Sequence, residues 1–245
     1  MKFLSLIAFA FLIVTAPSRS FAADTCQSLK RVKSTVSLWL SVPEPVIDHK
    51  ISREEINAGN EDVKKRWLED NGLEMAISTD SMETLGLNTS GWKVGFNRSA
   101  ITVRDFDRYA KPRTSCVYFK NLDVTLFLGS LISIPSEFNE GGCRYKNILE
   151  HEMRHYTTNE KIIRDARKKL EVELPKMLDE VEAESKPIVI KDENAEAQRL
   201  FGLIRDKIYK FLEENTREEM KKGHALIDTP EEYQSAGKMM KECGN

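Results

Sequence analysis

Two long runs of apolar residues at helical spacing, in the second half of this 245-residue chain, constrain its fold most. Apolar side chains recur there every three or four positions, which is typical of helices that bury one face. Their residues are Ile148, Leu149, Ile162, Ile163, Ala166, Leu170, Leu174, Leu178 and Val181, then Leu200, Leu203, Ile204, Ile208, Phe211 and Leu212. Pro175 is expected to kink or end the first helix, and Gly223 to end the second. With Pro187 between them, the runs predict an antiparallel helical hairpin that folds near residues 186 to 192.

The first of these helices carries His151, Glu152 and His155 in the pattern His-Glu-x-x-His. Residues four apart lie on one face of a helix, so the two imidazoles can bind a single metal ion. Glu152 stands beside them, where its carboxylate can take a proton from a metal-bound water. Two ligands and a general base within five residues indicate hydrolysis assisted by a zinc ion.

A catalytic zinc ion needs a third protein ligand, and His224 is the predicted one. If both helices rise by about 1.5 Å per residue from a fold at position 189, position 224 returns level with position 154. His224 would then lie in a loop just after the second helix, within a turn or two of the histidine pair. Acidic residues nearby are substitutes for it: Asp228, Glu231 and Glu232. Tyr233 is a possible hydrogen-bond donor to a developing oxyanion, or else a packed tyrosine of the last helix.

Other acidic residues fit the third position less well. Glu160 lies on the opposite face of the helix from the histidine pair. Three more fall on the continuation of that same helix: Glu171, Glu173 and Glu180. The remaining histidine, His49, has no spacing that links it to the site and is predicted to be a surface residue.

The predicted fold class is α+β, with a small, mostly antiparallel sheet followed by the long active-site helix and the helical hairpin. Short apolar pieces separated by turn residues predict three to five strands within about 73–138, and the helical part covers about 147–240. Before the sheet, apolar spacing predicts a helix from Cys26 to Leu40, and Ser52 opens a short helix that Gly59 closes. Thr229 and the proline after it start a short last helix.

The N-terminus predicts export to the periplasm or outside the cell. Residues 1–22 read as a signal peptide, with cleavage after Ala22 or Ala23 and an uncleaved anchor as the alternative, which leaves 23–245 as a single domain. The most apolar later segment, 124–134, is too short to span a bilayer. The chain has 37 basic and 39 acidic residues, which gives no argument for a nucleic-acid partner.

Four cysteines in an exported chain predict two disulfides. Three connectivities are possible. We expect Cys116–Cys143, which would close the sheet region before the active-site helix, and Cys26–Cys243, which would tie the chain ends together.

The motif with its neighbours Asn147 to Glu150, Tyr156 and Glu160 resembles the zincin metallopeptidases. It is most similar to a family of bacterial exported proteins described as predicted zinc-dependent proteases of unknown function. The resemblance covers roughly 141–170, with a fainter similarity over 224–233, and the chain lacks that class's standard third-ligand motifs. It implies a zinc-dependent hydrolase of peptide or protein substrates, with the two motif histidines as ligands and Glu152 as base.

Two functions are therefore expected. The first is an exported zinc peptidase, whose extended substrate would lie along an edge strand at 124–128 or 131–134. The alternative is a non-catalytic binding or assembly protein of the envelope that uses the long helical hairpin as its working surface.

Overall fold

The computed structural model describes residue 26 and residues 33–58, 61–73, 75–77, 86–107 and 114–243. The predicted signal peptide, its cleavage sites and Gly59 lie outside these residues. None of the described helices is long and apolar enough to cross a membrane.

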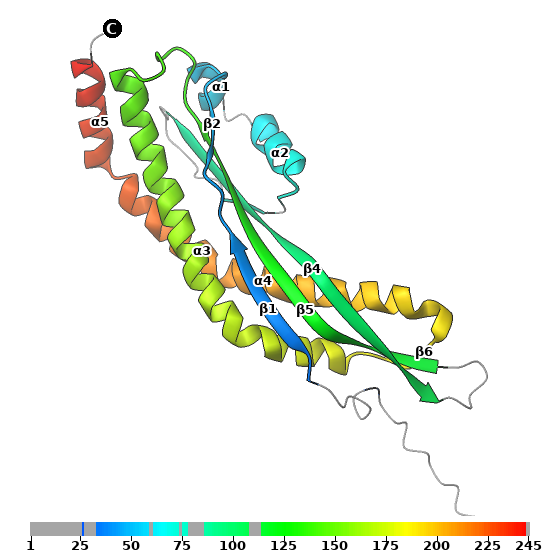
Figure 1. The fold of residues 1–245 in the computed structure, drawn as a ribbon. Helices are drawn as coiled ribbons and strands as arrows, with labels where there is room; N and C mark the ends of the chain where they lie inside the picture. The colour runs from blue at the N-terminus through cyan, green and yellow to red at the C-terminus, as the bar shows by residue number, and fades with distance from the viewer. Residues whose placement is uncertain are drawn as a thin grey trace, which may run out of the picture.

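One sheet, centred on a 20-residue strand, forms one layer of the protein (Figure 1). Its six strands, among the described residues, are β1 (Thr35–Ser41), β2 (Val46–Asp48), β3 (Met75–Ile77), β4 (Leu87–Asp107), β5 (Thr114–Ser133) and β6 (Ile188–Val189). Strand β4 runs antiparallel along one side of β5, and β3 adds to the outer side of β4. Along its other side β5 pairs in turn with β6 antiparallel, then β1 parallel, then β2 parallel.

This sheet corrects the predicted fold class. The α+β class stands, but a small, mostly antiparallel sheet of three to five strands is wrong, because the described sheet has six strands and is mixed. Two of its strands, β1 and β2, come from before residue 73 and lie parallel to β5. Two parallel strands that pair must be joined by a long connection, so the residues that pair lie far apart in the sequence and no local pattern predicts the pairing.

The expected helix from Cys26 to Leu40 is also wrong, because residues 35–41 form β1. Val36 and Leu40 are four apart, as a helix would space them, but Leu38 between them is apolar too. Alternation of apolar residues is typical of a half-buried strand. Leu38 is 8 % exposed and packs into the core, whereas its neighbour Trp39 is 62 % exposed.

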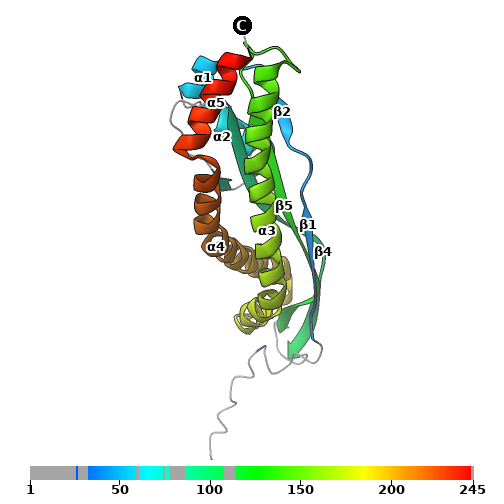
Figure 2. The same cartoon turned by 90° about the vertical axis from the view of Figure 1, so that its left-hand side faces the viewer.

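Two long helices cover one face of the sheet, as the turned view in Figure 2 shows. The described helices are α1 (Arg53–Asn57), α2 (Glu61–Asp70), α3 (Cys143–Ala183), α4 (Glu193–Ile227) and α5 (Pro230–Glu242), with a 3-10 turn at Ile190–Asp192. Ser52 caps α1 in a capping box and Thr229 caps α5, both as the sequence indicates. Of the two alternatives for Pro175, a helix end is excluded because α3 continues to Ala183, and the helix end predicted at Gly223 is wrong. Pro175 lies within α3, and Gly223 lies within α4, where an added Cβ would be 2.6 Å from Thr158 Cγ2 of α3.

The core lies between the sheet and the α3–α4 hairpin. In α4 a buried residue recurs every four positions from Glu196 to His224, and the stripe is apolar at Leu200, Ile204, Ile208 and Leu212. Toward the end of α4 the stripe becomes partly polar, with Thr216 and His224 on either side of the apolar Met220. The buried face of α3 becomes polar beside it, at Glu152, His155 and Asn159. The hairpin thus carries a buried polar end on an apolar body.

Two disulfides are present, but both predicted pairings are wrong. Cys26 is bonded to Cys116, and Cys143 is bonded to Cys243. The second bond joins the start of α3 to the end of α5, because α5 turns back beside the first half of α3 (Figure 1).

Candidate metal centre

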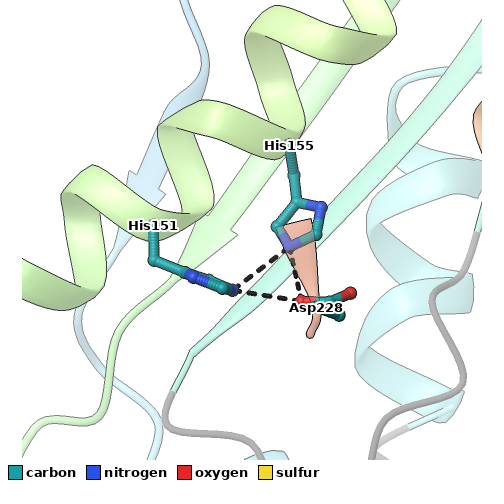
Figure 3. A group of neighbouring side chains, drawn as sticks. All are labelled: His151, His155 and Asp228. Atoms are coloured by element: carbon teal, nitrogen blue, oxygen red, sulfur yellow. Dashed lines mark hydrogen bonds and ion pairs between the residues drawn. The ribbon is translucent and has the colours of Figure 1, made fainter. Parts of the chain in front are cut away.

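Two side chains of α3 and the side chain of the residue that follows α4 meet at the polar end of the hairpin (Figure 3). His151 and His155 lie one turn apart on α3 and point to the same side. Asp228 is the residue after α4, and its backbone N–H donates to the carbonyl of His224 at 2.8 Å. The regular end of α4 therefore fixes the backbone of Asp228 opposite the two imidazoles.

The donor atoms of these residues form a nearly equilateral triangle. The two imidazole Nε2 atoms are 3.2 Å apart, and Asp228 Oδ1 is 3.2 Å from His151 Nε2 and 3.1 Å from His155 Nε2. Ligands of a tetrahedral zinc ion, bound at about 2.0–2.1 Å, lie about 3.3 Å from one another. The three atoms therefore fit three corners of such a site, and two imidazoles with one carboxylate are donors that zinc uses.

Hydrogen bonds alone explain this triangle poorly. If both Nε2 atoms carried hydrogen and donated to Asp228, two N–H groups would lie side by side across 3.2 Å. If one Nε2 lacked hydrogen, its lone pair would face the carboxylate oxygen at 3.1 or 3.2 Å. A cation bound by all three atoms removes either conflict, because each atom then directs a lone pair at it.

The charges of the site favour a bound cation. Burial acts to raise the pKa of Asp228, but hydrogen bonds from His151 and His155 outweigh it and hold that pKa far below its usual range. Burial likewise acts to lower the pKa of His151, and Asp228 and Glu152 overcome it, so that this pKa is raised. The site therefore keeps an ionised carboxylate and attracts positive charge.

Glu152 lies in the same polar end, buried and next to the triangle. It is 5 % exposed and packs against Gly86, where an added Cβ would be 2.8 Å from Glu152 Oε1. Burial raises the pKa of Glu152 to about 7, although the charges of His155 and His151 act against this rise. A carboxylate with a pKa near neutrality suits general acid–base catalysis.

Helix α5 brings Tyr233 to the site. A role as hydrogen-bond donor, one of the two alternatives expected for this residue, requires that position. Burial, together with the charge of Asp228 and a hydrogen bond to it, raises the pKa of Tyr233 to about 12. The hydroxyl therefore stays protonated at neutral pH and donates to the third candidate ligand. Glu232 forms an ion pair with Arg154, which also holds α5 against α3.

His224 lies beside the triangle but outside it. It sits in the last turn of α4, not in a loop, and its Nε2 is paired with Asn159 Oδ1 at 2.7 Å. The group that could hold a metal contains Asp228 in the place expected for His224. The sequence indicated Asp228 only as a substitute for that histidine. The helix continues past Gly223, which moves the facing residue one turn further along the chain.

Two other expectations about the surroundings of the site are wrong. Both proposed edge strands, 124–128 and 131–134, belong to or adjoin β5, which is paired on both sides. His49 is half-buried and packs edge-on against Tyr145 of α3, with ring centroids 5.1 Å apart.

Sequence reasoning missed a buried polar cluster behind the site. Asn159 donates to Ser90 of β4, Ser90 contacts Ser130 of β5 at 2.8 Å, and Gly86 packs on the candidate base. One signal was available for Asp228. It continues the four-residue spacing of the buried stripe of α4 by one more step after His224.

Comparisons with known proteins do not identify the chain: no family model, no curated protein and no solved structure matches it. The site must therefore be interpreted from its own geometry.

Proposed function

We propose that the protein is an exported zinc-dependent peptidase. His151, His155 and Asp228 hold the zinc ion, and Glu152 is the general base. The observation that carries the proposal is the triangle of three donor atoms at 3.1–3.2 Å beside a buried carboxylate. A metal-binding group alone occurs without catalysis, but a neighbouring base with a perturbed pKa is what a hydrolytic site requires.

When bound, zinc supplies a water of lowered pKa and polarises the carbonyl of the substrate. Glu152 accepts the proton of that water, because its own pKa of about 7 leaves it substantially ionised at neutral pH. The protonated carboxyl group then returns the proton to the leaving amine. Tyr233 is protonated and donates its single hydroxyl hydrogen to Asp228, so it would have to turn from Asp228 to donate a hydrogen bond to the developing oxyanion.

Export is proposed from the cysteines. Both disulfides are formed between described residues, and such bonds persist in oxidising compartments such as the periplasm or the extracellular space. A peptidase released there meets peptide or protein substrates, with no requirement for a nucleic acid.

The test is metal content and hydrolysis measured on the same samples. Protein purified without chelators should contain one zinc ion per chain and should hydrolyse casein, an unfolded substrate. A chelator should abolish hydrolysis, and added zinc should restore it. Asp228→Asn should lose both metal and activity, whereas Glu231→Gln, an exposed carboxylate three residues away, should keep both.

Two results would count against the proposal. Wild-type protein without stoichiometric zinc would show that the triangle is no metal site and would favour a binding protein of the envelope. Protein that binds zinc but hydrolyses no peptide bond would show that the centre is structural.

A further inference from the structure

His224 is a buried histidine to which the proposed mechanism gives no role. It is 6 % exposed and lies one turn before Asp228 on α4. Its ring packs on the ring of His155, with centroids 4.8 Å apart and planes inclined by 56°. It therefore touches a candidate ligand without belonging to the donor triangle.

A chain of buried hydrogen bonds fixes which nitrogen of His224 carries hydrogen. Asn159 Nδ2 donates to Ser90 Oγ at 3.2 Å, and Ser90 Oγ donates to Asn88 Oδ1 at 2.9 Å. Because the amide nitrogen of Asn159 is used in this way, its Oδ1 is the atom that faces His224 Nε2 at 2.7 Å. An amide oxygen only accepts, so His224 Nε2 must donate.

The other nitrogen of His224 then presents a lone pair. The His224 ring is buried and hydrogen-bonds to a neutral amide, and these surroundings disfavour a second ring hydrogen and the charge that it brings. A neutral imidazole carries one hydrogen only, and here Nε2 holds it. Nδ1 of His224 is therefore an acceptor.

His155 has the complementary need. Its Nε2 belongs to the donor triangle, and its Nδ1 is buried without a hydrogen-bond partner. A neutral imidazole that binds a metal through Nε2 carries its hydrogen on Nδ1. Ligand histidines usually donate that hydrogen to an acceptor, which fixes the ring and strengthens it as a ligand.

We infer that His224 is the positioning residue of His155: Asn159 holds the His224 ring on that of His155, and His224 Nδ1 accepts the hydrogen of His155 Nδ1 when the metal is bound. This inference rests on the proposed metal site and assigns His224 a role outside the ligand set. The chain from Asn88 through Ser90 and Asn159 then anchors the metal-binding helix to β4.

Cobalt(II) is the probe, since its visible absorption reports ligand geometry as well as binding. Metal-free full-length mature protein is titrated with Co²⁺ as wild type and as three variants: His224→Phe, His224→Gln and His155→Ala. Phe keeps a ring but has no acceptor. Gln can donate to Asn159 with its amide nitrogen and accept from His155 with its oxygen, so it is the matched conservative control.

We expect His224→Phe to weaken Co²⁺ binding by about 10–100-fold and to shift the visible bands, because losing such a partner usually costs that much affinity. His224→Gln should bind within a few-fold of wild type, and His155→Ala should bind far more weakly than either. Unchanged circular dichroism in His224→Phe excludes a folding defect. Proton–nitrogen correlation of the metal-free wild type should place the His224 hydrogen on Nε2, independently of any variant.

Several outcomes overturn the inference. Wild-type affinity and spectrum in His224→Phe would reduce His224 to packing, and the Nδ1–H tautomer would remove the acceptor. A loss as large as that of His155→Ala, not relieved by Gln, would make His224 a ligand. Wild-type protein that fails to bind Co²⁺ at one per chain would overturn the proposed function as well, which separates that failure from the others.

Discussion

Cys143, the first residue of α3, is disulfide-bonded to Cys243, the residue that caps the end of α5, and their Cα atoms are 5.5 Å apart. None of the α5 side chains that the structure describes is buried, so these side chains contribute little apolar packing. The disulfide, the Arg154–Glu232 ion pair and the Tyr233 hydrogen bond therefore attach α5 to the site.

The two disulfides are expected to differ in how fast a dithiol reduces them, because their cysteines differ in exposure. Cys143 is exposed, whereas Cys26 and Cys116 are both 0 % exposed. Exchange requires access of a thiolate to a sulfur atom, so a dithiol should reduce Cys143–Cys243 first. Timed reduction, alkylation and peptide mass mapping measure the order. Equal rates for the two bonds, or faster reduction of Cys26–Cys116, would contradict it.

Replacing the base should remove catalysis and leave the metal. Glu152→Gln retains the shape of the side chain but cannot accept a proton, so casein hydrolysis should fall by about 10²–10⁴-fold. Zinc content and circular dichroism should stay as in wild type. Glu150→Gln, an exposed change two residues away, is the control and should leave the rate unaltered. Loss of both metal and structure in Glu152→Gln would mean that this carboxylate is structural.

Gly86→Ala tests the surroundings of the base from the sheet side. The added Cβ would lie 2.5 Å from Ile148 Cγ2 and 2.8 Å from Glu152 Oε1, so one of these side chains has to move. We expect lower activity at unchanged zinc content, since neither histidine is touched. The matched control is Gly202→Ala in α4, where an added Cβ meets nothing within 4 Å. It should stabilise the helix by up to about 1 kcal/mol. Full activity in Gly86→Ala would show that Glu152 tolerates displacement.

Local patterns were enough to predict one half of the site. The spacing of His151 and His155 places them together on any helix, and the stripe around them requires one. The start of α5 could be predicted for the same reason, because Thr229 caps it with its own side chain. These features depend on residues a few positions apart.

The other half of the site depends on how α3 and α4 meet. Asp228, and not His224, faces His151 because α4 continues one turn past Gly223. Gly223 does not end the helix; it allows α4 to pack closely on Thr158 of α3. A shift of one turn exchanges one ligand for another. The strand β1 was missed for a related reason, since its stabilising partner β5 lies more than 80 positions later in the chain.

The last prediction concerns acid stability of the metal-free protein. Burial lowers the pKa of His224 from its ordinary value of 6.5 to about 4, so the unfolded chain binds a proton at this residue more readily than the folded protein does. Stability from His224 is therefore complete above about pH 6.5, is lost as the pH falls toward 4, and changes no further below that. With about 1.4 kcal/mol for each pKa unit, the loss is on the order of 3 kcal/mol at most.

Urea unfolding of chelator-treated protein at several pH values between 7 and 4 measures this loss. His224→Gln cannot titrate, so its free energy of unfolding should fall less than that of wild type over the same range. His151→Gln should behave in the opposite way. The pKa of His151 is raised in the folded protein, so its protonation stabilises the wild type as the pH falls, and removing it makes the acid loss larger. Parallel curves for wild type and His224→Gln would show that His224 is not held neutral by its surroundings.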